Sequence, residues 1–388
     1  MSKRIKFVLV SLLILSANAC FAGFEEGMDA AQNGDFVTAL KEWQPLADQG
    51  DASVQYNLGL IYGYGQGVPQ DDARALYWFR KSADQNDSSA QYNLGLMYAN
   101  GQGVPQDNEQ AAKWYAKAAT QGEASAQFNL GFMYANGHGV HKDDAKAMQL
   151  YRLAADQGEP NAQYNLGVRY ATGLGLPQNN LLALQWYRKS AEQGIAQAQY
   201  NLGVMYEKGQ AVSKDDTLAA QLFQKAAEQG HASAQNSLGL LYSSGKGIAK
   251  DNDLAVQWYR KAAEQGDASA QNNVGLAYKN GAGVIQNFAL AANWFMKSAG
   301  QGEIDGQHGL GLLYRDGQGV TQNLILAYAW LNLATASGQH DAKKERDEVS
   351  NKLTTKELQH AQQLSAKWKQ GSLIQVVAYK IKKNVPHH

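Results

Sequence analysis

Pairs of glycines separated by one residue recur along this chain, as in Gly101-Gln-Gly103 and Gly281-Ala-Gly283. Similar pairs occur in loops that cradle phosphate groups, where backbone N–H groups point at the ligand. A nucleotide loop also needs a preceding strand, and a third glycine or a Gly-Lys-Ser/Thr ending. The pairs here connect two predicted helices, so we interpret them as turns and not as nucleotide sites.

A second motif suggests acyl-transfer chemistry. Ser243-Ser-Gly-Lys246 matches the Ser-x-x-Lys pattern of penicillin-recognising enzymes. Those enzymes also carry a Lys-Thr-Gly sequence, which this chain lacks. Equivalent positions elsewhere read Ala-Asn-Gly-Gln or Ala-Asn-Gly-His, so this stretch is interpreted as drift within a repeated loop.

Histidines raise the question of a metal site. His138 and His141 fall in a predicted turn, and neither a cysteine nor another histidine is near them. Asp143 and Asp144 are better explained as a helix cap and a surface residue, while His387-His388 is too short to hold a metal. We therefore predict no metal and no cofactor.

The elements that position these residues are repeats. From residue 52 to residue 339 the chain divides into eight consecutive blocks of 36 residues without insertion or deletion. The blocks are 52–87, 88–123, 124–159, 160–195, 196–231, 232–267, 268–303 and 304–339. Residues are numbered below by their position, 1 to 36, within a block.

The first half of each block predicts an amphipathic helix. Gln at position 4, Gly at position 8 and Tyr at position 11 are present in all eight blocks, and position 7 is Leu except at Val274. The small residue at position 3 shares one helix side with positions 7, 8 and 11. Gly costs a helix about 1 kcal/mol relative to Ala, so its recurrence at position 8 indicates close approach of a partner helix. Gln at position 4 points toward the buried side, and we predict a structural role for it.

The second half of each block predicts another helix. Gly at position 14 suits a left-handed helix end, and Asp or Asn at position 20 can cap the next helix. Ala at position 24, large residues at positions 27 and 28, and small residues at positions 31 and 32 form its buried stripe. Gly at position 35, replaced only by Asn86, ends it. The predicted fold is all-α: an α-α superhelical solenoid of about eight helix-pair repeats with helical caps at both ends.

The block resembles the Sel-1-like repeat, a relative of the tetratricopeptide repeat. The shared pattern is A-x-A-Q-x-N-L-G-x-M-Y-x-x-G-x-G-V, continued by D, A, W-Y and K-A-A-x-Q-G at their spacings, over residues 52–339. The resemblance implies a right-handed superhelix that acts as an adaptor, often in bacterial envelopes and in host contact.

The ends of the array depart from the block pattern. Residues 23–51 predict an N-terminal capping half-repeat, in which Trp43 is in phase with a second helix. Residues 340–370 predict two capping helices, near Asp341–Leu353 and Thr355–Lys369, the latter with a Thr354–Glu357 capping box. The basic tail at 371–388 is consistent with either a short strand or a partner contact.

The first 22 residues predict an export signal: basic residues, an apolar run from Phe7 to Leu15, and small-x-small cleavage sites at Ala17-Asn18-Ala19 and Cys20-Phe21-Ala22. No stretch is long enough to span a membrane. We expect a periplasmic or secreted monomer, and favour this over an outer-membrane lipoprotein anchored through Cys20. The residues before Cys20 meet only part of the lipidation pattern.

Two positions of the first helix could contact a ligand on the inner curve of the solenoid. An asparagine at position 6 donates two hydrogen bonds and accepts others, which suits an extended peptide backbone. Aromatic residues at position 5 could serve as anchors. The predicted partner-binding residues are Asn57, Asn93, Asn129, Asn165, Asn201, Asn273, Tyr56, Tyr92, Phe128, Tyr164 and Tyr200. The alternative is that these side chains only pack between neighbouring blocks.

Together these features predict a non-enzymatic, exported scaffold that binds a protein or peptide. Lys+Arg and Asp+Glu balance at 35 each, and no basic run exceeds three residues, which argues against nucleic acid as a partner. An alternative function is assembly of cell wall or exopolysaccharide, with sugars on the aromatic residues. A third hypothesis, a weak hydrolase, is disfavoured because catalysis needs unlike residues in one pocket, whereas tandem blocks repeat the same ones.

Overall fold

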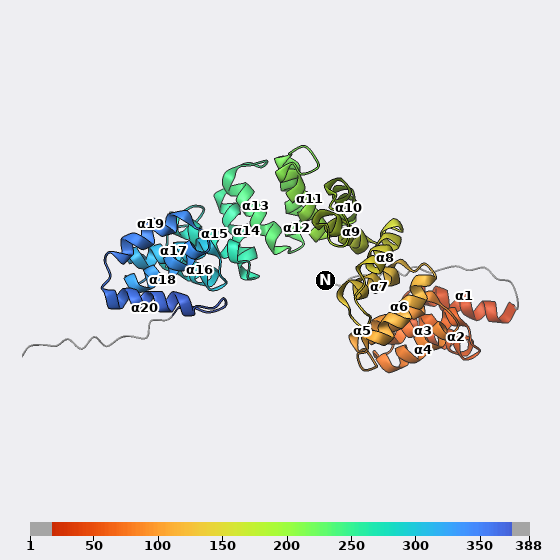
Figure 1. Ribbon diagram of the computed structural model, residues 1–388. Coiled ribbons are helices and arrows are strands. Elements are labelled where there is room, and N and C mark those ends of the chain that lie inside the picture. Colours follow the sequence, from red (N-terminus) through yellow and green to blue (C-terminus); the bar gives the residue numbers. More distant parts are fainter. Residues whose placement is uncertain (1–17, 375–388) are drawn as a thin grey trace, which may run out of the picture. The chain divides into compact units, whose positions relative to one another are not determined.

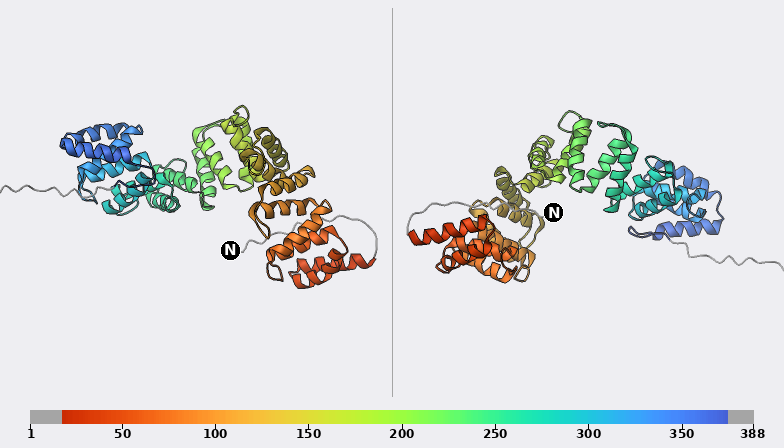
Figure 2. Two further views of the ribbon diagram at one scale, coloured as in Figure 1. Left: turned by 60° about the horizontal axis from the view of Figure 1, so that its bottom comes forward. Right: turned by 180° about the vertical axis from the view of Figure 1, so that it is seen from behind.

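The computed structural model describes residues 18–374, with side chains from Gly23 onward. These residues form twenty α-helices and no strand, which confirms the all-α solenoid class. The chain divides into two compact units, residues 1–178 and 179–388. Within each unit, consecutive helices lie side by side in antiparallel pairs (Figures 1 and 2). Residues 1–17 of the predicted export signal (1–22) and residues 375–388 of the predicted tail (371–388) fall outside the described residues, whereas residues 18–22 form the start of the first helix.

The described part of the first unit contains nine helices. They are α1 (Asn18–Gln32), α2 (Phe36–Asp48), α3 (Ala52–Tyr64), α4 (Asp72–Asp84), α5 (Ser88–Asn100), α6 (Asn108–Thr120), α7 (Ala124–Asn136), α8 (Asp144–Asp156) and α9 (Pro160–Thr172). Helices α3 to α18 each begin at position 1 or position 21 of a block. The odd-numbered members, α3 to α17, are called first helices below and the even-numbered members, α4 to α18, second helices.

The described part of the second unit contains eleven helices. They are α10 (Asn180–Glu192), α11 (Ala196–Lys208), α12 (Asp216–Glu228), α13 (Ala232–Ser244), α14 (Asn252–Glu264), α15 (Ala268–Asn280), α16 (Phe288–Gly300), α17 (Ile304–Asp316), α18 (Leu324–Ala336), α19 (His340–Ser350) and α20 (Thr355–Lys367).

Recurring polar residues and glycines set the ends of these helices. Every Asp or Asn at position 20 accepts a hydrogen bond from a backbone N–H in the first turn of the second helix, as Asp107 does from Gln110. Every glycine at position 14 ends a first helix with φ between 64° and 74°. Both predicted capping roles are confirmed.

The glycine at position 8 allows a large side chain of the second helix to lie against the first helix. A Cβ atom added to Gly95 would come within 2.4 Å of the Tyr115 ring, and one on Gly275 within 2.7 Å of the Phe295 ring. No real Cβ atom tolerates such a distance. The predicted close approach is thus confirmed, and position 28 supplies the approaching side chain.

The glutamine at position 4 joins neighbouring repeats. Its Nε2 donates to the carbonyl oxygen of position 32 in the preceding repeat, as from Gln55 to Ala47 at 2.8 Å and from Gln127 to Ala119 at 3.2 Å. In six blocks its Oε1 accepts from the glutamine at position 34 of the same repeat, as Gln127 does from Gln157 at 2.8 Å, whereas the last block carries Ser337 at that position. The side chain is buried throughout, which confirms its structural role.

Small residues fill the space where the helices cross. At positions 24 and 31 every residue is Ala or Ser, and none is more than 1% exposed. The second glycine of each turn, at position 16, lies against the preceding pair's second helix: a Cβ on Gly247 would come within 2.1 Å of the Asp216 carbonyl oxygen. The Gly-x-Gly pairs are therefore interhelical turns. Ala211 replaces one such glycine at φ 59°, a conformation that costs an L-residue roughly 1–2 kcal/mol.

Helix pairs also close the array at each end. In α2, Ala39, Trp43, Leu46 and Ala47 are buried, and the Trp43 ring fills the space that Gly27 leaves on α1. At the other end, α20 begins with the predicted Thr354–Glu357 capping box. After α20 the chain turns back, and the Gly371 N–H donates to the Gly300 carbonyl oxygen at 2.7 Å.

Candidate binding face on the first helices

Positions 2, 5, 6, 9, 12 and 13 form the side of each first helix that lies opposite its buried stripe. We call this side the first-helix face; it is carried by α3, α5, α7 and α9 in the first unit and by α11, α13, α15 and α17 in the second. The eleven predicted partner-binding residues all lie on it. Ten of them are half-buried, and Asn57 is buried at 8% exposure.

The rings at position 5 are fixed by rings of the second helix in the same block. Centroids lie 5.8 Å apart for Tyr56 and Phe79, and 5.9 Å apart for Phe128 and Tyr151. Tyr200 packs on Phe223 at 5.6 Å and stacks on His231 at 4.8 Å. Such tilted arrangements are the favoured geometry of aromatic pairs. One side of each of these rings is thus used inside the fold.

The asparagines at position 6 contact the preceding repeat. Asn93 hydrogen-bonds to the Tyr56 hydroxyl, and Asn129 to the Tyr92 hydroxyl, each across a separation of 37 residues. Burial raises the pKa of Tyr56 to about 12, and the contact with Asn93 opposes part of that rise. In the second unit the same register joins Asn273 to Asn236 at 2.9 Å.

These contacts use only part of what an asparagine offers. The amide carries two donor hydrogens and an oxygen with two lone pairs. Asn93 gives one hydrogen to the Ser89 carbonyl oxygen of its own helix at 2.9 Å. The asparagines that remain half-exposed are therefore held in place by the fold while part of each amide faces outward.

The structure draws attention to position 9, which the sequence analysis did not identify as a candidate contact. It is apolar in all eight blocks: Leu60, Leu96, Phe132, Val168, Val204, Leu240, Leu276 and Leu312. Phe132 is 46% exposed, Leu240 45% and Leu276 37%, and the others are half-buried. A constant apolar residue on an outward helix side was the sequence signal that could have identified it.

The two units carry different charges on this face. In the first unit its 24 positions include no Asp, Glu, Lys or Arg. In the second unit the 24 equivalent positions include six charged residues: Glu207, Lys208, Lys279, Asp305, Arg315 and Asp316. The aromatic residue at position 5 also gives way there to Asn236, Asn272 and His308.

Charged residues form a network at the C-terminal end of the face. Arg315 Nε donates to Asp316 Oδ1 at 2.7 Å, and Arg315 Nη1 lies 4.0 Å from Glu345 of α19. The Arg315 hydrogen bond lowers the pKa of Asp316 and raises that of the guanidinium. His308 also pairs with Glu345, in the 37-residue register of the asparagine contacts.

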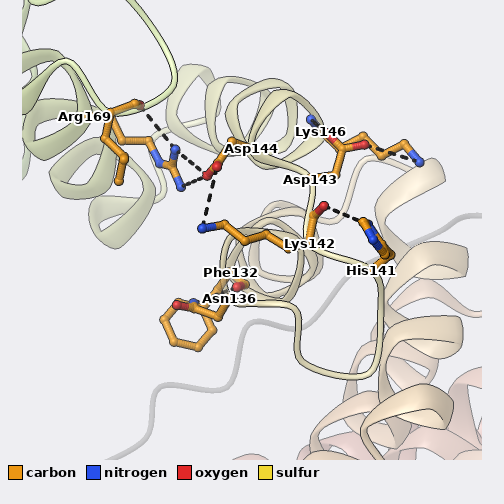
Figure 3. A network of polar contacts seen from close by, with 9 residues as sticks. Phe132, Asn136, His141, Lys142, Asp143, Asp144, Lys146 and Arg169 are labelled. Carbon is orange, nitrogen blue, oxygen red and sulfur yellow. Dashed lines mark hydrogen bonds and ion pairs between the residues drawn. The ribbon is translucent and has the colours of Figure 1, made fainter.

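A buried ion pair distinguishes the α8–α9 junction. Arg169 occupies position 10, where the other blocks carry Ile, Met, Leu or Ala, and is 6% exposed. Both terminal nitrogens lie 3.1 Å from Asp144 Oδ1, and Lys142 approaches the other carboxylate oxygen at 3.8 Å (Figure 3). The carboxylate therefore neutralises a cation that has replaced a core side chain.

The histidines and the serine that the sequence analysis considered for metal binding or catalysis make only local contacts. His141 Nδ1 contacts the Lys142 carbonyl oxygen at 3.0 Å, whereas His138 lies edge-on to Phe132 (Figure 3 shows His141 and Phe132). The Ser243 hydroxyl donates to the Leu240 carbonyl oxygen at 3.0 Å and accepts from Tyr259 at 3.1 Å. Within residues 18–374, no three His, Cys, Asp or Glu side chains gather as metal ligands. Over the same range no helix is long and apolar enough to cross a membrane.

Comparisons with known proteins agree with this architecture. The sequence model described as Sel1 repeat matches eight segments: 52–87, 88–123, 124–159, 160–195, 196–231, 232–267, 268–303 and 304–339. A protective antigen present in uropathogenic Escherichia coli strains, displaying an SLR fold, is 34% identical with a TM-score of 0.65; the match covers 90% of this chain and 84% of the antigen. A Sel1 repeat protein from Oxalobacter formigenes is 33% identical with a TM-score of 0.56, over 63% of this chain and 96% of that one. No curated protein sequence matches significantly.

Proposed function

Because the chain belongs to the Sel1 repeat family, whose members are generally protein-interaction scaffolds, we propose that it binds a polypeptide segment along its first-helix face. The observation that carries this proposal is the apolar residue at position 9 in all eight blocks. Apolar side chains kept on an outward helix side gain free energy when a partner covers them, at about 25 cal/mol per Å². The half-exposed asparagines beside them would satisfy the partner's backbone.

A polypeptide fits this face better than a carbohydrate does. Sugars stack on broadly exposed aromatic ring faces, whereas the rings at position 5 are half-buried and pack on position 28, as Tyr92 does on Tyr115 at 5.9 Å. A row of aliphatic residues at position 9 suits apolar side chains of a peptide. We therefore propose a non-enzymatic scaffold, with Asn93, Asn129, Asn165, Tyr92 and Phe128 among the contact residues.

Site-specific photo-cross-linking tests the proposal. A benzoylphenylalanine replaces Phe132, and a matched control replaces Tyr77, which is 51% exposed on the second helix α4. We expect polypeptides to cross-link at position 132 and not at position 77. Capture of cell-wall polymer alone at position 132 would favour the assembly-factor alternative, and equal capture at both positions would contradict the assigned face.

Export is part of the proposal. A cut after Ala22 removes the first five residues of α1 and leaves Gly23–Gln32, including Phe24, whose carbonyl oxygen accepts from Trp43 Nε1 at 3.3 Å. Cleavage at that point is therefore compatible with an intact cap. Mass spectrometry of the mature protein should find an N-terminus near Gly23. A lipid-bearing N-terminus at Cys20 would instead establish an anchored adaptor, and an intact Met1 would contradict export by a cleaved signal.

A further inference from the structure

Arginine–tyrosine pairs recur between neighbouring repeats on a surface away from the first-helix face. An arginine at position 29 of a second helix donates to the hydroxyl of the tyrosine at position 11 in the next repeat. Arg188 reaches Tyr206 at 2.9 Å, and Arg260 reaches Tyr278 at 2.7 Å. The other two pairs are Arg80 with Tyr98 and Arg152 with Tyr170.

The α6–α7 junction keeps the tyrosine and lacks the arginine. Position 29 is Ala116, and the tyrosine is Tyr134. A surface cavity of about 230 Å³ lies at this junction. Its lining includes both of these residues, with Ala112, Leu130 and Val140 as apolar walls. At the other junctions that lack this arginine, position 29 carries a longer side chain than alanine: Gln224, Met296 and Asn332.

Charged residues stand at the edge of this cavity. Glu109 and Lys113, four residues apart on α6, both line it. Lys146 lies over the Tyr134 ring, 5.1 Å from its centroid, and also approaches Asp143. That lysine covers a face of the ring, whereas the recurring arginines meet the hydroxyl at the ring edge. Among the described residues, no hydrogen bond engages the Tyr134 hydroxyl.

We propose that the α6–α7 cavity is a binding site for an arginine side chain supplied by a partner polypeptide. The molecule itself shows the occupant, because four other junctions fill the equivalent space with a guanidinium on the same tyrosine hydroxyl. Glu109 would pair with the incoming charge, and guanidinium geometry suits a carboxylate and a hydroxyl together. The site lies between a second helix and the next repeat, so it does not depend on the function proposed for the first-helix face.

The test uses the full chain and the blocked tripeptide acetyl-Gly-Arg-Gly-amide. The readout is the movement of the Gly139 and Val140 amide cross-peaks in a nitrogen–proton correlation spectrum. We expect saturable shifts with a Kd in the millimolar range, since one side chain makes few contacts. The peptides with lysine or the isosteric, neutral citrulline should bind at least fivefold more weakly.

Four variants decide the assignment. Ala116→Arg restores the recurring pair; it should fill the cavity, raise Tm and abolish the shifts. Tyr134→Phe and Glu109→Gln should each weaken binding at least threefold. Lys113→Gln, which introduces the residue found at this position in four other blocks, should strengthen binding about twofold because it removes a like charge.

Three results would overturn the proposal. They are the absence of shifts at up to about 20 mM peptide, equal binding of the citrulline peptide, or unchanged binding by a folded Ala116→Arg protein. A circular dichroism melt verifies folding of each variant. Because Ala116→Arg reproduces a pairing that the fold already accommodates four times, loss of structure in that variant would itself contradict the assigned arrangement.

Discussion

The first-helix face is built on the same backbone in both units but carries different side chains. In the first unit it is uncharged, with aromatic residues at position 5 from Tyr56 to Tyr164 and Gly or Ala at position 12. In the second unit position 12 is Glu207, Ser243, Lys279 or Arg315. The residues that hold the repeats together, Gln at position 4 and Gly at position 8, do not differ. Positions 4 and 8, which the fold requires, are therefore constant, whereas the proposed binding face differs between the units.

The same comparison predicts that the units contribute differently to capture of a partner. Replacing Leu60, Leu96 and Phe132 by Ser removes three apolar contacts of up to about 1.5 kcal/mol each, so affinity per folded molecule should fall by up to about a thousandfold. Leu60 and Leu96 also pack against core residues, so a circular dichroism melt measures the folded fraction of each variant. The matched change at Val204, Leu240 and Leu276 should cost about tenfold, because charged neighbours supply part of the second unit's binding. The partner polypeptide identified by cross-linking is titrated against each triple variant to measure its affinity. Equal losses of affinity in the two variants would contradict a different contribution of the two units.

Position 10 offers a second contrast between the units, since Arg169 in the first corresponds to Met205 in the second. Asp144→Ala leaves the arginine buried without its carboxylate and should lower the free energy of unfolding by about 2 kcal/mol. This is less than the usual cost of breaking a buried pair, because Asp144 is one-third exposed. Arg169→Met should be neutral or stabilising by about 1 kcal/mol. Urea unfolding measures both. If Arg169→Met costs as much as Asp144→Ala, the pair is a net stabilising contact.

Charge on the second unit should affect the rate of association. Lys208→Gln with Lys279→Gln removes two cations from this face, and Glu207→Gln removes an anion. The two variants should shift the association rate in opposite directions by about threefold at low salt, and both effects should vanish near 0.5 M salt. Biolayer interferometry at two salt concentrations is the measurement. Identical rates for all three proteins at low salt would show that these charges do not meet the partner.

The smallest expected effect concerns alkaline unfolding. Burial raises the pKa of Tyr56 and of Tyr151, each to about 12, in the first unit. Between pH 10 and 12 the unfolded chain has released protons that the folded chain keeps, so stability is constant below pH 10 and falls above it. Replacing both tyrosines by Phe should raise the alkaline midpoint by about 0.5 pH.

The control for that experiment lies in the second unit. Burial also raises the pKa of Tyr259 and Tyr314, and their replacement by Phe gives the matched variant. Its midpoint, followed by far-ultraviolet circular dichroism, should move less than that of the first-unit variant. A larger shift in the control would place the most alkali-sensitive tyrosines in the second unit.

Much of the fold could be predicted from the sequence because its determinants are local and repeated. Gly at position 14 and Asp or Asn at position 20 mark helix ends, and Gly95 indicated a close contact before its partner Tyr115 was known. The carbonyl that Gln127 reaches could not be predicted, because it depends on how neighbouring pairs stack. The same holds for the contact between Asn93 and Tyr56.

The candidate site was predicted less completely. Attention to polar and aromatic residues identified positions 5 and 6 but not the apolar row that includes Leu96 and Phe132. Departures from the repeat, such as Arg169 and Ala116, do not stand out in the sequence, since either residue is common in helices. Their significance depends on the space that the fold gives them.

The glutamine contacts have a consequence for how such a chain changes during evolution. In six of the eight blocks the Gln at position 4 has one hydrogen-bond partner in its own copy and another in the copy before it, as Gln235 has in Gln265 and Ala227. When a gene segment is duplicated or deleted in whole multiples of 36 codons, these hydrogen bonds can form again at the new junction. A segment of any other length disrupts them there. Unequal recombination can therefore lengthen or shorten this molecule without a new interface having to arise.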